Sequence, residues 1–360
     1  MKVMSIFGTR PEMIKMWSTL KKLDDLNFDH IMVHTGQNFT PELKNFFFND
    51  LELRQPDYQL EIDTSSPAKE TADVIVKSDE LFGKEQPDAL LILGDTYSGL
   101  SVIPAAQRGI KIFHMEAGLR AWDRRMPEQR NRMLIDHMSN ILLPFNNYHR
   151  ENLIRENIHP AKIFLTGNPT FEAMRKFRPR IDESSIMKKL GLSKNGYILV
   201  TAHRSENVDN PEYLAAMFKA FEDIAKRFDK LVLYPMHPRT KSKMSSIGVP
   251  KGIKIIDPLG FYDFNRLFID AFCVLSDSGT ASEEGLYYRV PVVSLRMTTE
   301  RPETVEGGGH IVAGMDPNNI ADSVETIVRE PYAARYDLNE GFEASNVVVN
   351  CIRSQITNWF

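Results

Sequence analysis

Short apolar runs alternate with segments of helical periodicity along the first part of the chain. The apolar runs predict buried strands at residues 2–7, 29–34, 90–93 and 111–114. The periodic segments predict helices after Pro11, around 41–50, at 68–82 and at 98–107. A strand, a helix and a second strand in close succession are typical of right-handed βαβ units in a parallel sheet.

The same pattern returns in the second half of the chain. Strands are expected at 197–201, 231–234, 253–256, 272–275 and 291–295, and helices at 210–228, 261–269 and 280–288. A chain of 360 residues is too long for one average domain, and a linker lies near 168–188.

We therefore expect an α/β fold with two Rossmann-like, doubly wound domains at 1–170 and 171–342. The two domains are expected to face each other, with the active site in the interdomain cleft. The last segment, 343–360, is expected to form an amphipathic helix that packs back on the first domain.

One turn of the second domain has the composition of an anion site. The sequence SDSGTASEEG at 276–285 follows an apolar run and leads into a predicted helix, with Glu283 and Glu284 in its first turn. The backbone N–H groups at such a helix start favour phosphate, and a glycine lets it approach closely. A carboxylate one turn further on suits the hydroxyls of a ribose. An ordinary βα turn with a serine cap is the alternative.

Composition excludes several classes of protein. The net charge of −4 gives no indication of a nucleic-acid or anionic-membrane surface. The two cysteines, Cys273 and Cys351, have no metal-site spacing, and Cys273 lies in an apolar run typical of a buried thiol. Neither a signal peptide nor an 18-residue apolar run is found, which favours a cytoplasmic protein.

Polar side chains stand where the predicted strands of the first domain end. Arg10, Asp95 and Glu116 all follow apolar runs, and ligands collect at the carboxyl ends of parallel strands. Asp95 by itself is better explained as a cap of the next helix. Pro127 is typical of a first helical position, which would place Glu128 in the first turn of a helix.

The second domain adds an imidazole and cationic groups. His203 directly follows a predicted strand, which would bring a titratable ring to the cleft, although a buried structural histidine is an equal alternative. Arg301 would contact phosphate oxygens in a bidentate manner, and His237 ends another strand and offers a further cationic edge. Three carboxylates and one imidazole beside a diphosphate site suit proton removal and return at a carbon centre.

Eight short motifs occur in order along the chain. They are GTRPE at 8–12 with Lys15, GDT at 94–96, HMEAGLR at 114–120, PE..NR at 127–132, TGN at 166–168, TAHR.EN at 201–207, DSG..SEE at 277–284 and TTERPE at 298–303. Together they span the chain, and the sequence resembles the non-hydrolysing UDP-N-acetylglucosamine 2-epimerase family from end to end.

The resemblance implies a GT-B arrangement of the two domains and inversion of C2 of a UDP-2-acetamido sugar. UDP would be eliminated to leave a 2-acetamidoglucal and then added back, with no metal, no nicotinamide and no other cofactor. The matching catalytic positions are Asp95, Glu116, Glu128 and His203. The matching nucleotide or active-site positions are Arg10, Lys15, Ser278, Gly279, Thr280, Glu284 and Arg301. The family also implies a homodimer that makes precursors of surface polysaccharides.

Departures from the family pattern bear on the substrate and on regulation. Thr280 and Ser282 stand where a glycine and a glutamine are frequent, and Gln129 replaces a glutamate. Bacterial members of the family have glutamines after the HTGQ motif that help bind an allosteric UDP-N-acetylglucosamine. These glutamines are not evident at 38–42, so we do not expect this regulation. The pattern at 123–139 is similar to a branch that acts on 2,3-diacetamido-glucuronate or 6-deoxy sugar nucleotides. A hydrolysing 2-epimerase, a GT-B glycosyltransferase and a non-catalytic sugar-nucleotide sensor are the alternative functions.

Overall fold

The computed structural model of the chain describes most of its residues. The described ranges are 1–36, 48, 51–123, 126–236, 238–244, 248–329 and 343–355. The helix expected around 41–50 lies outside them apart from Phe48, and His237 lies outside them as well.

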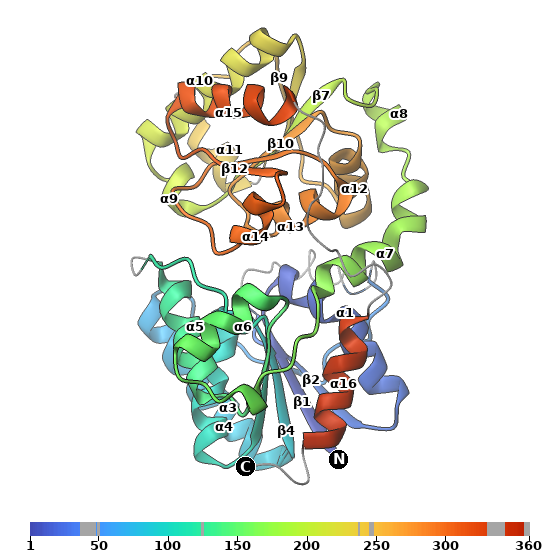
Figure 1. Cartoon of the computed structure of the whole chain (residues 1–360), viewed down its shortest axis with the longest axis vertical. Helices are drawn as coiled ribbons and strands as arrows, with labels where there is room; N and C mark the ends of the chain where they lie inside the picture. Colours follow the sequence, from blue (N-terminus) through green and yellow to red (C-terminus); the bar gives the residue numbers. More distant parts are fainter. Residues whose placement is uncertain are drawn as a thin grey trace. The chain divides into compact units, whose positions relative to one another are not determined.

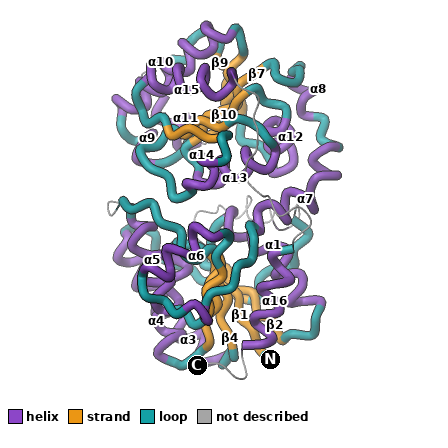
Figure 2. Tube along the Cα trace, viewed as in Figure 1, coloured by secondary structure: helices purple, strands orange, loops and turns teal. Residues whose placement is uncertain are grey.

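The chain forms two compact units. Unit 1 comprises the described residues of Met1–Ala173 and Asn339–Phe360, and unit 2 is Met174–Leu338. Each unit contains its own six-stranded sheet, drawn in orange and flanked by helices in Figure 2. The units are therefore described one at a time.

The sheet of unit 1 is parallel throughout, with the order β3-β2-β1-β4-β5-β6. Its strands are β1 (Lys2–Phe7), β2 (Asp29–His34), β3 (Tyr58–Gln59), β4 (Ala89–Leu93), β5 (Lys111–Met115) and β6 (Ile141–Leu143). This is the strand order of a dinucleotide-binding Rossmann domain. The edge strands β3 and β6 were not predicted, because two or three residues are too few to carry a pattern.

The helices of unit 1 cover both faces of its sheet (Figure 1). They are α1 (Arg10–Asp25), α3 (Pro67–Glu85), the 3₁₀ helix η1 (Tyr97–Ser101), α4 (Val102–Gln107), α5 (Pro127–Met138), α6 (Asn147–Arg155), η2 (Pro160–Lys162), α7 (Pro169–Asp182), which runs on into unit 2, and α16 (Ala344–Gln355). The predicted helix at 98–107 is thus a 3₁₀ turn followed by a short α-helix. Alternate strand residues such as Met4 and Ile92 pack against α3 and α4, while Val3 and Leu91 are buried on the opposite face.

The C-terminal helix α16 packs beside α1 within unit 1 (Figure 1). The buried carboxylate of Glu172 accepts hydrogen bonds from the backbone N and the hydroxyl of Ser345 at 3.0 and 2.6 Å, which satisfies the start of α16. At the other end of the helix the Arg353 guanidinium lies 3.9 Å from the ring centre of Phe28.

Unit 2 repeats the topology, with a parallel sheet in the order β12-β11-β10-β7-β8-β9. Its strands are β7 (Tyr197–Thr201), β8 (Leu231–Pro235), β9 (Ile253–Ile256), β10 (Cys273–Ser276), β11 (Val292–Ser294) and β12 (His310–Val312). Its helices are α8 (Ile186–Leu190), α9 (Ser205–Val208), α10 (Pro211–Phe228), α11 (Pro238–Lys243), α12 (Phe261–Ile269), α13 (Gly279–Tyr288), α14 (Pro302–Glu306) and α15 (Pro317–Arg329).

Both faces of the unit 2 sheet are buried as well. Helices α10 and α15 cover one face through residues such as Phe221 and Val324, and α12 and α13 cover the other through residues such as Phe268. The doubly wound α/β prediction is therefore confirmed for each half of the chain. Cys273 is buried within β10, and burial raises the pKa of its thiol to about 12.

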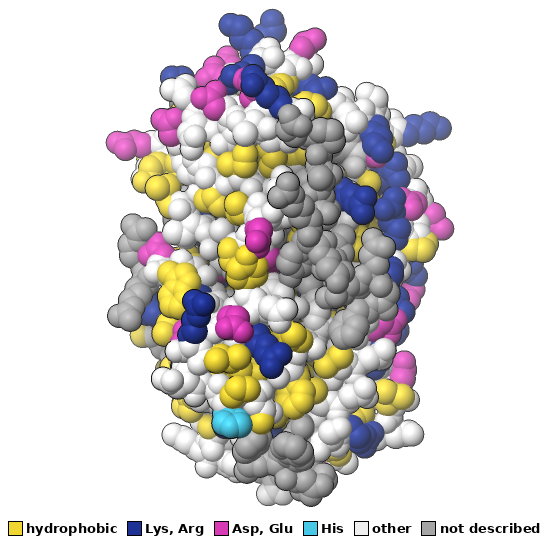
Figure 3. All heavy atoms as spheres, in the orientation of Figure 1, with side chains coloured by type: hydrophobic (Ala, Val, Ile, Leu, Met, Phe, Trp, Pro, Cys, Tyr) yellow, Lys and Arg dark blue, Asp and Glu magenta, His cyan; other side chains and the backbone are white. Residues whose placement is uncertain are grey.

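Charges of both signs are interspersed on the face drawn in Figure 3. Exposed pairs such as Arg227 with Asp322, at 2.7 Å, link neighbouring helices of unit 2. Among the described residues, we find no helix with the length and apolarity needed to cross a membrane.

Candidate active site

The turn after β1 is tied to the turn after β4 by one buried carboxylate. Oε2 of Glu12 accepts hydrogen bonds from the backbone N atoms of Gly8 and Thr9 and from the Thr9 hydroxyl, at 2.7–3.1 Å. Its Oε1 accepts from the hydroxyls of Ser98 at 2.6 Å and Thr96 at 3.0 Å. Burial raises the pKa of Glu12, and these hydrogen bonds oppose the rise. Arg10, the first residue of α1, is held half-buried at this turn.

Asp95 is held by helix α5 at the end of β4. It follows Gly94, whose φ of +75° makes the sharp turn out of the strand. The Asp95 carboxylate forms an ion pair with Arg132, and its backbone oxygen accepts a hydrogen bond from Asn131 Nδ2 at 3.1 Å. The cap position of the following helix is Thr96, so the interpretation of Asp95 as a helix cap is wrong.

Glu116 occupies a strained position directly after β5. Its φ of +64° lies in the left-handed region, where a residue with a side chain is uncommon and often functional. Its Oε2 lies 2.6 Å from Nζ of Lys15, and the two side chains are only 7% and 4% exposed. Lys15, for which the sequence indicated no definite role, is thus the buried counter-ion of Glu116.

Glu128 lies in the first turn of α5, where Pro127 is the first helical residue as predicted. Its side chain is half-buried. The pKa of Tyr97 is raised mainly by burial and, to a smaller extent, by the charges of Glu70 and Glu128. Glu128 therefore lies near that ring. The neighbouring Gln129 is buried, and its Oε1 accepts a hydrogen bond from the backbone N of Ala121 at 2.7 Å.

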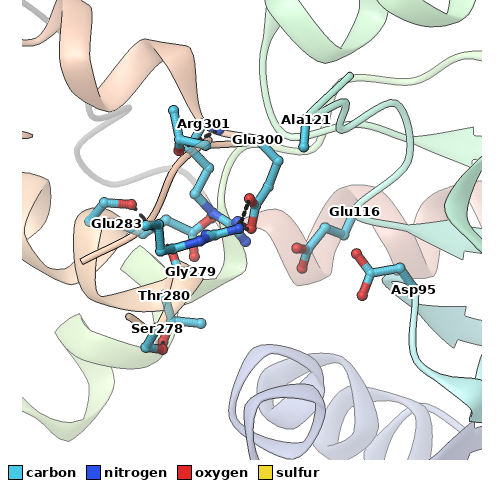
Figure 4. Close-up of polar contacts among 12 residues, drawn as sticks. Asp95, Glu116, Ala121, Ser278, Gly279, Thr280, Glu283, Glu300 and Arg301 are labelled. Atoms are coloured by element: carbon cyan, nitrogen blue, oxygen red, sulfur yellow. Dashed lines mark hydrogen bonds and ion pairs between the residues drawn. The ribbon is translucent and has the colours of Figure 1, made fainter. Parts of the chain in front are cut away.

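Two of the predicted carboxylates of unit 1 are brought together. Strands β4 and β5 are neighbours in the sheet. Figure 4 shows the carboxylates of Asp95 and Glu116 pointing toward the same region beyond the ends of these strands. Each has its own cation, Arg132 or Lys15. Sequence reasoning missed Arg132, although its place four residues after Glu128 puts both on one face of α5.

The phosphate-type turn of unit 2 lies between β10 and α13. Helix α13 begins at Gly279 with Ser278 as its cap, so the placement of Glu283 and Glu284 in the first turn was wrong, and both lie in the second. A Cβ at Gly279 would lie 2.7 Å from Glu300 Oε1 and 3.0 Å from Arg301 Nη1. Any larger residue at this helix start would therefore force the Glu300 or Arg301 side chain to move.

Arg301 belongs to a buried network of charges beside Gly279 (Figure 4). Its Nε lies 2.9 Å from Glu283 Oε1, and its Nη1 donates to Glu300 Oε1 at 2.5 Å. Glu300 Oε2 also accepts from Arg296 Nη2 at 2.8 Å. The guanidinium of Arg301 is therefore fixed against the start of α13 by carboxylates of its own unit. Thr280 and Glu284 are half-buried on the same helix, and the hydroxyls of Ser278 and Thr280 are 3.1 Å apart.

His203 follows β7 with its side chain 53% exposed, which does not fit a buried structural histidine. The fully buried carboxylate of Asp277 accepts hydrogen bonds from the backbone N atoms of His203 and Arg204 at 2.8–3.1 Å. Asp277 therefore ties the turn that carries His203 to the turn before α13. Within the described residues, no group of three or more histidine, cysteine, aspartate or glutamate side chains has the geometry of a metal site.

A family model described as UDP-N-acetylglucosamine 2-epimerase matches residues 21–352. The chain belongs to the UDP-N-acetylglucosamine 2-epimerase family. The resemblance found in the motifs and the predicted enzyme class, an isomerase, are thereby confirmed.

Similar proteins cover the full length of the chain. A UDP-N-acetylglucosamine 2-epimerase of Methanococcus maripaludis is 35% identical over 361 residues, which covers 98% of each chain. A UDP-2,3-diacetamido-2,3-dideoxy-D-glucuronate 2-epimerase of Pseudomonas aeruginosa is 32% identical over 351 residues, 96% of this chain and 98% of that protein. The crystal structure of Methanocaldococcus jannaschii UDP-GlcNAc 2-epimerase in complex with UDP-GlcNAc and UDP has a TM-score of 0.90 and 32% identity, and it covers 98% of this chain and 99% of that chain.

Proposed function

We propose that this protein inverts C2 of UDP-N-acetylglucosamine to give UDP-N-acetylmannosamine. The observation that carries the proposal is the pair of carboxylates, Asp95 and Glu116, at neighbouring strand ends, each with a cation beside it. A helix start suited to a diphosphate, in unit 2, supports it. The full-length similarity to UDP-N-acetylglucosamine 2-epimerases supports the same substrate class.

In this proposal unit 2 binds the nucleotide. The backbone N–H groups at the start of α13, around Ser278, Gly279 and Thr280, would bind the diphosphate, because the helix dipole favours an anion there. Glu284, in the second turn, would accept hydrogen bonds from the ribose hydroxyls. Arg10 would contribute a further positive charge, and Arg301 would position the glycine turn through its carboxylate partners.

Unit 1 would supply the proton transfers. One carboxylate would take the proton from C2 while the C1–O bond breaks and its electron pair leaves with UDP, which gives a 2-acetamidoglucal. UDP would then add back to C1 while an acid returns a proton to the other face of C2. Asp95, Glu116 and Glu128 are the proposed acid and base groups. His203 would stabilise or protonate the leaving diphosphate.

The test is proton NMR of UDP-N-acetylglucosamine incubated with the protein in D₂O. We expect UDP-N-acetylmannosamine to appear and deuterium to enter C2, because the returning proton comes from an acid that exchanges with solvent. Free N-acetylmannosamine with UDP would instead indicate a hydrolysing epimerase. Deuterium-free transfer of the sugar to an acceptor would indicate a glycosyltransferase.

The P. aeruginosa relative makes a diacetamido-glucuronate nucleotide the second candidate substrate. If UDP-N-acetylglucosamine does not react, UDP-sugars with 3-acetamido, 6-deoxy and uronic groups are tested in the same way. Lack of exchange at C2 in all of them would refute the proposed function.

We further propose that the enzyme is a cytoplasmic homodimer that makes surface-polysaccharide precursors, as the family resemblance implies. A solution mass near twice the chain mass of 41.2 kDa, measured by sedimentation, would support the dimer. A mass of one chain would contradict it.

A further inference from the structure

A buried histidine of unit 1, His114, stands between the two turns that carry Asp95 and Glu116. It lies on β5, two residues before Glu116, and its side chain has no exposed surface. The function proposed above does not use it directly. Its surroundings nevertheless connect it to both candidate catalytic carboxylates.

Both ring nitrogens of His114 face hydrogen-bond acceptors. Nε2 lies 2.8 Å from the backbone oxygen of Gly94, and Nδ1 lies 2.8 Å from Oδ1 of Asp136 on α5. A carbonyl oxygen only accepts, so Nε2 must carry a proton. Nδ1 must carry one as well if the Asp136 carboxylate is ionised.

Asp136 is held in the ionised form by its other contacts. Its Oδ2 lies 2.8 Å from Arg120 Nη2 and accepts a hydrogen bond from the backbone N of Gly118 at 3.2 Å. Burial opposes ionisation and the contact with His114 favours it; independently of His114, the charge and hydrogen bond of Arg120 also lower the pKa of Asp136. Arg120 also pairs with Glu156 at 2.6 Å, and His137 lies 3.4 Å from the same carboxylate. With His114 charged, the connected side chains of His114, Arg120, Asp136 and Glu156 comprise two cations and two carboxylates.

These contacts fix the backbone around both candidate catalytic residues. The Gly94 peptide is held on both sides, because its N donates to Met115 O at 3.0 Å and its O accepts from His114. Asp95 is the next residue. On the other side, Gly118 closes the turn that begins at Glu116, and a Cβ there would lie 2.2 Å from the backbone oxygen of His149.

One face of α5 organises the whole arrangement. Glu128, Arg132 and Asp136 are spaced by four residues, so they lie on one side of the helix. Arg132 pairs with the Asp95 carboxylate, and Asp136 holds the turn after Glu116 and, through His114, the turn before Asp95. A turn displaced by about 1 Å is enough to lower a reaction rate by on the order of 100-fold.

We propose that His114 carries a proton on both ring nitrogens and acts as a positioning residue for Asp95 and Glu116. The positioning role rests on the proposed epimerase function, whereas the charge of the ring does not. A ring with a proton on both nitrogens donates to the Gly94 carbonyl and to the Asp136 carboxylate at the same time. A neutral ring has only one N–H in either tautomer and can donate to only one of them.

The chain offers a matched control, His30 on β2. Its Nδ1 lies 2.7 Å from Asp24 Oδ1, its Nε2 lies 3.0 Å from the Ser5 hydroxyl, and its side chain is 1% exposed. It is therefore also a buried histidine paired with an aspartate in unit 1. His30 is the second residue of its strand and so lies near the amino-terminal ends of the parallel strands, whereas Asp95 and Glu116 follow the carboxyl-terminal ends.

The first test is ¹⁵N NMR of the histidine rings in the full-length protein. His114 is expected to show two protonated ring nitrogens with imidazolium shifts at pH 7.5, because both nitrogens face hydrogen-bond acceptors. His310, whose pKa burial and the charge of Arg296 lower to about 4, serves as the neutral reference in the same spectrum. A single protonated nitrogen on His114 at pH 7.5 would overturn the proposal, and this test needs neither turnover nor a stable variant.

The second test compares His114→Asn with His30→Asn. We expect kcat for UDP-N-acetylglucosamine to fall by about 10- to 100-fold in His114→Asn, with KM changed less than about threefold. His30→Asn is expected to keep kcat within about twofold, even if its thermal stability falls as much. Equal kcat values for the two folded variants would overturn the positioning role. A wild-type protein that turns over no UDP-sugar would instead refute the proposed function, and the ring spectrum would still decide the charge.

Discussion

Replacing Lys15 by methionine tests whether the buried cation is needed by Glu116. Nζ of Lys15 lies 2.6 Å from Glu116 Oε2, with both side chains almost completely buried. At an effective dielectric constant of about 20, two unit charges at this distance attract by about 6 kcal/mol. Removing one partner leaves a buried carboxylate without this cation, so we expect Lys15→Met to lower the free energy of unfolding by about 3–5 kcal/mol.

The assay is urea unfolding followed by tryptophan fluorescence. The sequence has three tryptophans, Trp17, Trp122 and Trp359, and none of them belongs to unit 2, so the fluorescence reports on unit 1. The double variant Lys15→Met with Glu116→Gln removes both charges and is expected to recover most of the lost stability, because a neutral pair needs no counter-ion.

A half-buried pair at the surface of unit 1 supplies the control. Lys77 and Asp73 on α3 lie 3.1 Å apart, with side chains 34% and 32% exposed. Lys77→Met should leave the urea midpoint nearly unchanged, because ion pairs at the surface are screened by solvent. If Lys15→Met unfolds at the same midpoint as Lys77→Met, the argument that Glu116 depends on a buried cation is refuted.

Three further predictions concern catalysis, nucleotide binding and pH. Glu128→Gln should keep UDP affinity in calorimetry but lower the epimerisation rate by on the order of 100-fold or more, as loss of an acid or base group does; near-wild-type turnover would remove Glu128 from the mechanism. Glu284→Ala should weaken UDP binding by about 1–3 kcal/mol for a lost charged hydrogen bond, and an unchanged dissociation constant would contradict the ribose role. Burial and the charge of Arg296 lower the pKa of His310 to about 4, so the folded protein keeps the ring neutral while the unfolded chain protonates it; stability should therefore fall as the pH drops from about 6.5 to about 4. At pH 5 the loss relative to pH 7.5 should be about 2 kcal/mol larger in the wild type than in His310→Asn by urea unfolding, and equal losses would exclude His310 as the cause.

Most elements of the fold could be predicted from local pattern. Strands such as β1 and β7 are buried on both faces, so they are continuous apolar runs that need no tertiary information to be recognised. Pro11 and Pro127 mark helix starts for a local reason, since a proline ring suits the first turn of a helix. The short edge strands β3 and β12 were not predicted, because two or three residues are too few to show the alternation of a strand.

Several candidate residues could be found from the sequence because they follow a strand or lie in the first turn of a helix. Asp95 and Glu116 follow β4 and β5 within two residues, and the parallel strands of the unit 1 sheet bring their carboxyl ends to one edge. His203 follows β7 of the unit 2 sheet at the same distance as Asp95 follows β4. The ordered motifs identified the family, since independent short motifs in the same order do not arise from secondary structure alone.

Only the tertiary structure decided which groups hold these residues. Lys15 and Glu116 are 101 residues apart, and His114 reaches Asp136 and Gly94 across separate elements. Such contacts depend on the register of packed helices and strands, which no local pattern contains. The sequence by itself determined two doubly wound halves and the residues offered for chemistry. The positions of α1 and α5 beside the turns after β5 and β4 decided the charge partner of each carboxylate, because an ion pair between distant residues exists only once the chain has folded.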